Sequence, residues 1–189
     1  IEFKNVSFGY NEEKILKNVS FKLEPNKTYA LVGSSGGGKS TIAKLISGFY
    51  RINEGEILIG GKNIALYSRN ALMKNIAFVF QTSKLFKMSI FENVKMGNKD
   101  ASDEDVMNAL KLARCEDILA KFPEREKTLI GSKGVHLSGG EIQRVAIARA
   151  ILKNADIIIL DEASAAADPE NEYEIQQAFS NLMKNKTVI

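Results

Sequence analysis

The chain has 189 residues, enough to bury the core of one domain, and its apolar fraction of 44% is that of an ordinary soluble protein. A net charge of +3 is too small to predict binding to nucleic acid or to a membrane surface, and the longest apolar stretches, such as 157–160, are far too short to cross a bilayer. The single cysteine, Cys115, excludes an internal disulfide and indicates a reducing, cytosolic setting.

The first third of the chain alternates apolar and polar residues in the manner of β-strands. Expected strands cover residues 2–8, 19–23, 28–32, 55–59 and 76–80. Gly60 and Gly61 stand between the last two of these and mark a tight turn. The sequence begins directly with strand alternation, so we expect no signal peptide, and residues 186–189 stop inside a further expected strand.

Residues 33–40 carry the phosphate-binding pattern G-x-x-x-x-G-K-[ST], between the expected strand 28–32 and a helix expected at 41–47. Glycines let backbone N–H groups close around a phosphate chain, the lysine reaches the β- and γ-phosphates, and the serine hydroxyl can ligate Mg²⁺. The alternative, a flexible Gly/Ser turn that happens to precede a lysine, does not account for the flanking strand and helix. The predicted nucleotide contacts are Gly33, Ser34, Ser35, Gly36, Gly37, Gly38, Lys39, Ser40 and Thr41.

Helical spacing governs the middle and the end of the chain. Ser102 and Asp105 form a capping-box pattern ahead of Val106, Leu110 and Ala113, and this predicts an α-helical insert from about 89 to 122. Cys115 lies in this insert, where we expect a structural thiol. Further helices are expected at 139–153 and 169–183, with a strand at 156–160 between them. Strands that alternate with helices around a phosphate loop indicate an α/β fold with a mainly parallel, covered sheet.

The apolar run at 157–160 ends in Asp161 and Glu162. A carboxylate at the end of a buried strand can hold Mg²⁺, and an adjacent acid can orient and deprotonate an attacking water. General-base assistance of this kind gives roughly 10²–10⁴-fold in rate. An Asp-Glu pair that merely ends a core strand is the alternative, and the upstream phosphate loop favours the catalytic interpretation.

Residues 137–141 read Leu-Ser-Gly-Gly-Glu. Ser138 and Glu141 form a capping box. A cap does not need two glycines, which weaken a helix start by roughly 1 kcal/mol each relative to alanine. Gly139 and Gly140 instead predict a second helix terminus whose bare N–H groups can touch a phosphate.

The order of these motifs, with Gln81 between the first two, resembles the nucleotide-binding domain of ATP-binding-cassette (ABC) transporters. The likeness runs from Val6 to the last residue. It implies a P-loop NTPase with a mainly parallel central sheet, an N-terminal antiparallel β part and an α-helical subdomain. The chain would form one ATPase domain over 1–189, with a RecA-like core at about 1–84 and 154–189 and a helical subdomain at about 85–153.

The resemblance also implies a head-to-tail dimer with a second ABC ATPase domain, identical or not. Each of two ATP molecules, with Mg²⁺, would lie between the phosphate loop of one subunit and Ser138, Gly139, Gly140 and Glu141 of the other. Asp168 matches the aspartate that crosses the interface in this family.

Single positions match the family in the same way. Tyr10 resembles the aromatic residue that stacks on adenine, although a tyrosine that merely ends a strand is the alternative. Gln81 resembles the glutamine that touches Mg²⁺ and water and senses the membrane domain. The implied metal ligands are thus Ser40, Gln81 and Asp161, and the implied catalytic residues are Glu162, Lys39 and Gln81.

Residues 85–94 and 128–134 resemble exporters in which the membrane domain and the ATPase share one polypeptide. The resemblance then implies a transmembrane domain N-terminal to this chain, a place at the cytoplasmic face of the cell membrane, and ATP hydrolysis that energises transport. No nucleic acid is expected as a partner. A soluble ABC ATPase that acts on DNA or ribosomes, and a regulatory module with little hydrolysis, are the alternatives. A simple P-loop kinase or GTPase does not need the Leu-Ser-Gly-Gly segment.

Several positions depart from the family pattern. Glu141 stands where the family has Gln, and its carboxylate is expected to add negative charge near the partner's γ-phosphate and to lower activity. Ala165 and Ala167 replace a usual Ser and Leu, and Ser132 replaces a common Glu. The resemblance implies that the switch histidine follows the strand that begins at Thr187, and the sequence ends at Ile189. His136, the only histidine, is expected to be a loop or packing residue instead. We therefore expect a truncated domain that binds ATP and hydrolyses it poorly.

Overall fold

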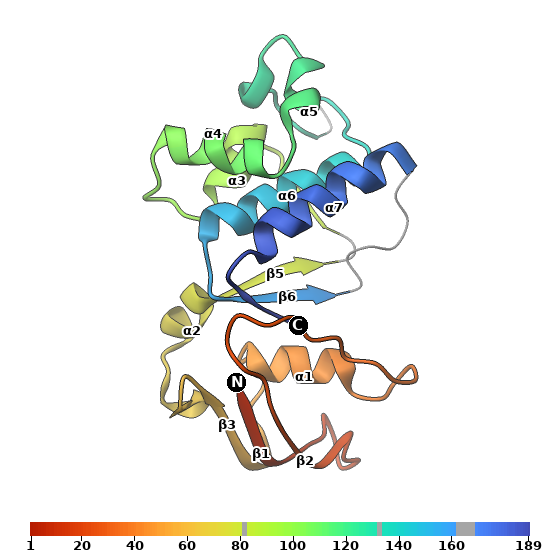
Figure 1. Cartoon of the computed structure of the whole chain (residues 1–189), viewed down its shortest axis with the longest axis vertical. Helices are drawn as coiled ribbons and strands as arrows, with labels where there is room; N and C mark the ends of the chain where they lie inside the picture. The colour runs from red at the N-terminus through yellow and green to blue at the C-terminus, as the bar shows by residue number, and fades with distance from the viewer. Residues whose placement is uncertain (81–82, 132–133, 162–168) are drawn as a thin grey trace. The chain divides into compact units, whose positions relative to one another are not determined.

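The computed structural model describes residues 1–80, 83–131, 134–161 and 169–189, and the side chains of Asp161 and of 169–171 are outside the description (Figure 1). The described chain divides into two units. The first contains residues 1–76, 156–159 and 185–189, and the second contains residues 77–155 and 160–184. No described helix is both long enough and apolar enough to cross a membrane.

An antiparallel sheet in the order β2-β1-β3-β4 forms one part of the first unit. Its strands are β1 (Glu2–Phe8), β2 (Leu16–Lys22), β3 (Glu54–Ile59) and β4 (Lys62–Asn63). Phe3, Val6 and Phe8 of β1 are buried. The strand is irregular between Phe3 and Val6, where Asn5 has a φ of 49°, and this shift brings residues of odd and even number to the core. Gly60 and Gly61 join β3 to β4 with φ values of 59° and 77°, the conformation of a two-residue hairpin turn. The strands expected at 2–8, 19–23 and 55–59 are therefore confirmed, with β2 beginning three residues early.

Parallel pairing occurs in the same unit. Strand β6 (Ile157–Asp161, whose last two residues belong to the second unit) pairs in parallel with β7 (Thr187–Val188) through Ile157 and Ile158. Thr28 forms a parallel bridge to Val188. The strand predicted at 28–32 is wrong beyond that bridge: Tyr29 N–H donates to the Val188 carbonyl, and residues 29–32 form no strand. Val32 is 90% exposed rather than buried. Antiparallel, parallel and helical elements together confirm the predicted α/β fold.

Helix α1 (Lys39–Ile46) follows the glycine-rich loop in the first unit (Figure 1). It buries Thr41, Leu45 and Ile46. The short helix η1 (Ile64–Leu66) and helix α2 (Arg69–Asn75) complete the unit. The helix expected at 41–47 is thus confirmed, with its start two residues earlier.

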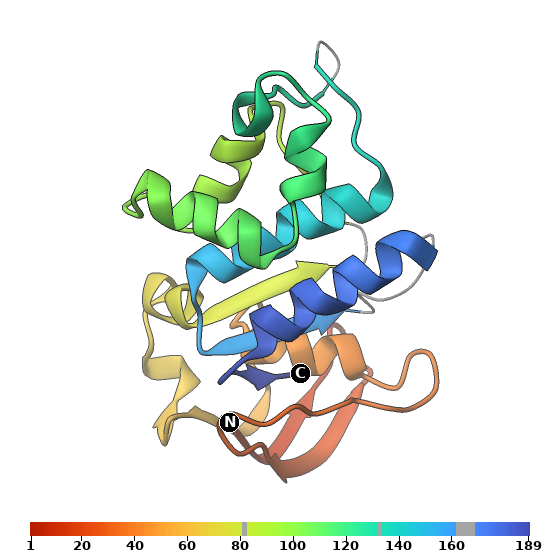
Figure 2. The same ribbon diagram turned by 45° about the horizontal axis from the view of Figure 1, so that its top comes forward.

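The second unit is mainly helical. Its elements are β5 (Ile76–Phe80, whose first residue belongs to the other unit), α3 (Ile90–Lys95), α4 (Asp103–Leu112), α5 (Glu116–Ala120), η2 (Arg125–Lys127), α6 (Gly139–Lys153) and α7 (Pro169–Met183). Helix α6 lies in the middle and contacts α3, α4 and α7 (Figure 2). The helical insert and the helices at 139–153 and 169–183 are confirmed, as is the capping box of Ser102 and Asp105.

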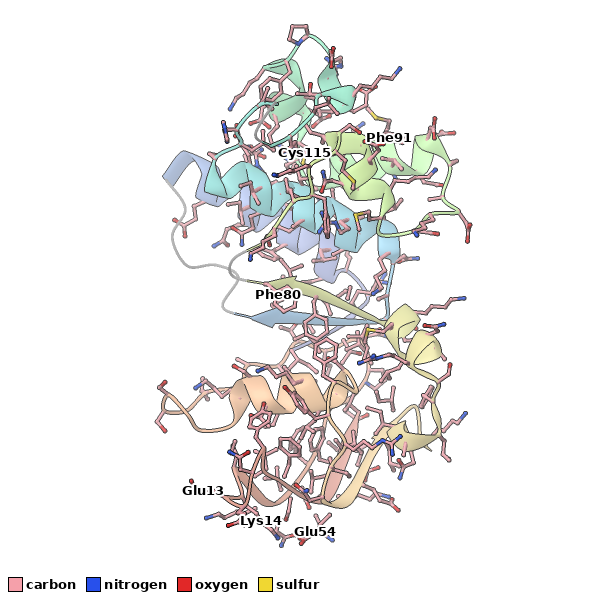
Figure 3. All side chains as sticks on the ribbon, turned by 180° about the vertical axis from the view of Figure 1, so that it is seen from behind. Glu13, Lys14, Glu54, Phe80, Phe91 and Cys115 are labelled. Carbon is pink, nitrogen blue, oxygen red and sulfur yellow. The ribbon has the colours of Figure 1, made fainter. Side chains whose placement is uncertain are left out.

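Two ion pairs tie α5 and the segment before it to the neighbouring helices. Arg144 of α6, which is 1% exposed, forms a bidentate pair with Asp117 at 2.7 and 2.9 Å. Arg114 pairs with Glu174 of α7 at 2.7 Å. Cys115 lies beside them, fully buried (Figure 3), and burial raises the pKa of its thiol to about 12. The thiol is therefore inert and structural, as the sequence predicts.

The segment before α3 is organised by a buried amide. Asn93 is completely buried, accepts a hydrogen bond from the Phe86 N–H at 2.8 Å, and donates to the carbonyls of Phe86 and Ser89, both at 3.0 Å. Arg149 of α6 donates to the Asn93 carbonyl at 2.8 Å and lies 5.7 Å from the centre of the Phe86 ring. The segment is thus held by both α3 and α6.

Candidate nucleotide-binding site

The phosphate loop of the first unit leads into an uncapped helix start. The N-cap residue of α1, Gly38, makes no side-chain cap hydrogen bond, and the first turn contains no acidic residue. Backbone N–H groups at such a terminus carry partial positive charge. The start of α1 therefore offers donors to an anion without competition from a capping side chain.

Gly38 is required at its position by both conformation and space. Its φ of 86° lies in the left-handed region, and a Cβ built there would stand 2.6 Å from Leu16 Cδ2. Gly36 has a similar φ of 79°, but a Cβ there would meet nothing within 4 Å. The loop is thus held tightly against β2 at its last glycine.

Lys39 folds back over the loop that precedes it. Its Nζ donates to the carbonyl oxygens of Gly33 and Ser34, both at 2.8 Å. These bonds hold the ammonium on the loop, where it can meet a phosphate. Ser40 follows at the second residue of α1 and is exposed, so its hydroxyl is open to a ligand.

These residues fit the expected Mg²⁺. The ion prefers oxygen donors and keeps several waters, so it needs only one or two protein ligands beside the phosphates. The exposed hydroxyl of Ser40 is such a donor. In the described ranges there is no group of three His, Cys, Asp or Glu side chains, the kind of cage that an all-protein metal site would need.

Tyr10 lies beside α1. Its hydroxyl is 3.4 Å from Thr41 Oγ1, and its ring is 42% exposed. The ring meets Phe8 and Tyr50 edge to face, with centroids 5.1 and 5.0 Å apart. An exposed ring held by two neighbours next to the phosphate loop is suited to stacking on a base. Tyr50 could not be identified from the sequence, since a lone tyrosine four residues after α1 forms no pattern.

The second unit contains residues 138–141, which we call the signature segment. Ser138 caps α6, and its Oγ accepts from the Glu141 N–H at 3.3 Å while Glu141 Oε2 accepts from the Ser138 N–H at 2.7 Å. This confirms the predicted capping box. Gly139 is exposed, and a Cβ there would meet nothing within 4 Å, so neither conformation nor neighbouring atoms require glycine.

Glu141 has a partner that the sequence does not reveal. Lys121, which closes α5, places its Nζ 2.5 Å from Glu141 Oε1. Burial of Glu141 opposes ionisation, but the hydrogen bonds from Lys121 and Ser138 outweigh it and lower the pKa of the carboxyl below its usual value. The expected excess negative charge on the segment is therefore balanced within the unit, since Lys121 carries the opposite charge.

Several predicted residues lie outside the described part of the chain. These are Gln81, Ser132, Glu162, Ala165, Ala167 and Asp168. Asp161 is described as the last residue of β6, without its side chain. His136 is exposed in a loop, as expected.

Comparison with known proteins supplies the family context for these residues. A family described as "ABC transporter" matches residues 16–165. The chain is 44% identical over 189 residues to the putative multidrug export ATP-binding/permease protein YgaD of Bacillus subtilis, covering 99% of this chain and 33% of that protein. It is 47% identical over 192 residues to an ATP-dependent lipid A-core flippase of Haemophilus influenzae, covering all of this chain and 33% of the flippase.

A third relative is the ABC transporter B family member 4 of Dictyostelium discoideum, 44% identical over 192 residues, with all of this chain and 25% of that protein covered. The chain thus spans a third or less of the length of these relatives.

Proposed function

Because the chain belongs to the ABC transporter family, we propose that it binds and hydrolyses ATP to energise transport across a membrane. The uncapped start of α1, with Lys39 held on the loop before it, is the observation that carries this proposal. A triphosphate is the ligand that matches a row of N–H donors, an ammonium and a serine hydroxyl at one helix terminus. Tyr10 beside Thr41 suits an adenine base.

The proposed active form is a head-to-tail dimer with a second ABC ATPase domain. Each ATP would lie between the phosphate loop of one subunit and the signature segment of the other. The start of α6 supports this role, because Gly139 in its first turn is exposed and its backbone can approach a phosphate closely. Asp168 would cross the interface between the subunits.

The proposed reaction is attack of water on the γ-phosphorus of ATP. Glu162 accepts the proton of the attacking water, and Lys39 stabilises the charge that develops on the phosphoryl oxygens. Ser40, Gln81 and Asp161 would hold Mg²⁺, which would neutralise part of the phosphate charge. The bond to the β-phosphate oxygen breaks, and ADP and inorganic phosphate leave.

The names of the relatives support a transporter of the exporter type. YgaD is described as an export ATP-binding/permease protein, and the Haemophilus protein as a flippase, each about three times the length of this chain. We propose that this chain works with a transmembrane domain N-terminal to it on the same polypeptide, at the cytoplasmic face of the cell membrane. Its RecA-like core would comprise about 1–84 and 154–189, and its helical subdomain about 85–153.

Replacement of the proposed base tests the function. In the complete protein, Glu162→Gln should retain ATP binding, accumulate an ATP-bound dimer and lose roughly 10²–10⁴-fold in turnover, since the amide cannot accept the proton. ATP binding by filter assay, dimer size by chromatography and phosphate release measure the three effects. Turnover at the wild-type rate would remove Glu162 as the base. ATP binding without hydrolysis by the unaltered protein would favour a regulatory module.

A further inference from the structure

Lys121 reaches the signature segment from a different element. It closes α5, yet its Nζ lies 2.5 Å from Glu141 Oε1, 20 residues further along the chain. The lysine side chain is 55% exposed, whereas that of Glu141 is 8% exposed. The pair thus joins a solvated cation to a nearly buried carboxylate.

The buried carboxylate is also part of the α6 cap. Its second oxygen, Oε2, accepts from the Ser138 N–H at 2.7 Å. A carboxylate removed from water is destabilising unless it is paired and hydrogen-bonded. Lys121 supplies the pairing, so the carboxylate can remain in the capping box in its charged form. Without Lys121, rotation of Glu141 towards water would break the bond to Ser138.

A glutamine at position 141 makes the contrast clear. A glutamine amide oxygen could accept the same Ser138 N–H without a charge, and it would need no cation beside it. A carboxylate at this position does need one. Glu141 therefore depends on Lys121 in this chain.

We propose that Lys121 is a positioning residue for the signature segment. By holding the Glu141 carboxylate in the capping box, it fixes the backbone of the first turn of α6, whose N–H groups would meet the ATP of the partner subunit. The role rests on the proposed function, since a partner's ATP is the ligand in question. Lys121 itself touches neither substrate nor reacting atoms in this proposal.

Replacement of Lys121 in the complete protein, with either Glu141 or glutamine at position 141, tests the positioning role of this lysine. Lys121→Met keeps the aliphatic stem and removes the charge. It should lower ATP turnover about tenfold in the wild-type background, the loss expected for one hydrogen bond to a charged group. In the Glu141→Gln background the same change should cost less than about twofold, because no carboxylate is left to neutralise. Lys111→Met, an exposed lysine on α4, should change turnover less than about twofold in either background.

Thermal unfolding in the absence of ATP compares the effect of Lys121→Met on stability in the same two backgrounds. Lys121→Met should lower the unfolding temperature by roughly 2–4 °C in the wild-type background and by less in the Glu141→Gln background. Equal losses of turnover in the two backgrounds would overturn the proposal, as would equal shifts in the unfolding temperature. Absence of hydrolysis by the unaltered protein would overturn the proposed function instead, and the unfolding comparison would still decide whether the pair holds the segment.

Discussion

The two helix starts proposed to face phosphate, those of α1 and α6, are built in opposite ways. Helix α1 begins after a glycine in the left-handed conformation, with no side-chain cap and no acid in its first turn. Helix α6 begins with a complete capping box and an acidic residue in its first turn, paired to Lys121. One terminus leaves its donors for a ligand, whereas the other satisfies part of them from within the chain.

This difference indicates how each terminus depends on nucleotide. The start of α1 lacks a capping partner, so a bound phosphate would complete it and stabilise it. The start of α6 is already formed by its own side chains, so it can be presented as a preformed surface to a second subunit. We therefore expect changes at α1 to act mainly on ATP affinity, and changes at α6 to act mainly on stability and turnover.

The largest expected effect is at the uncapped terminus. Lys39→Ala removes the ammonium held over the Gly33 and Ser34 carbonyls, and it should weaken ATP binding by about 100-fold, the upper range for hydrogen bonds to a charged group. Isothermal titration with ATP measures the affinity. Lys17→Ala, an exposed lysine of β2, is the control and should bind ATP as before. Unchanged affinity in Lys39→Ala would remove this residue from the site.

A smaller effect is expected from the glycine that the loop requires. Gly38→Ala places a Cβ against Leu16 at a φ of 86°. The left-handed conformation should cost about 1–2 kcal/mol in free energy of unfolding, and displacement of Leu16 should add to that cost. We expect ATP affinity to fall about tenfold. Gly36→Ala has a similar φ and open space, so it isolates the conformational part. Thermal unfolding of the two variants measures the difference, and Gly38→Ala should unfold at the lower temperature. Equal unfolding temperatures would show that contact with Leu16 does not hold the loop.

The smallest expected effect is at the cap of α6, where a change in stability can be distinguished from a change in ATP turnover. Ser138→Ala removes one capping oxygen and should lower the free energy of unfolding by about 1 kcal/mol. Ser102→Ala removes the matching oxygen of α4, which has the same capping box and no proposed part in ATP binding. Similar losses of stability, with a loss of turnover only in Ser138→Ala, are expected from denaturant unfolding and phosphate release. Equal turnover in the two variants would contradict the contrast between the termini.

The elements with local signals could be predicted from the sequence. The bounds of α6 and α7 follow from a serine cap, a proline and helical spacing, all of which are short-range. Residues 28–32 could not be predicted in this way, because their strand pairing depends on Val188, 160 residues away, and local spacing carries no signal for such a partner. Their apolar composition alone predicts a buried strand, and Val32 is instead 90% exposed.

In the candidate site, too, the contiguous motifs could be predicted from the sequence and the long-range contacts could not. The phosphate loop and the capping box of Ser138 and Glu141 are contiguous motifs, so their pattern could be read directly. Tyr50 next to Tyr10 and Lys121 next to Glu141 are brought together by the fold, and no spacing rule links them. The difference matters most for Glu141, because the effect of its negative charge depends on Lys121, which lies 20 residues away in the sequence.

The buried thiol of Cys115 has a practical consequence. A thiol with a pKa of about 12 is almost entirely protonated at neutral pH, and complete burial keeps reagents away from it. Alkylation of this cysteine, the only one in the 189 residues, would therefore report opening of the helical unit around it. A second cysteine introduced at an exposed position would be the one that reacts in the folded chain, and it could carry a spectroscopic label without removal of the native residue.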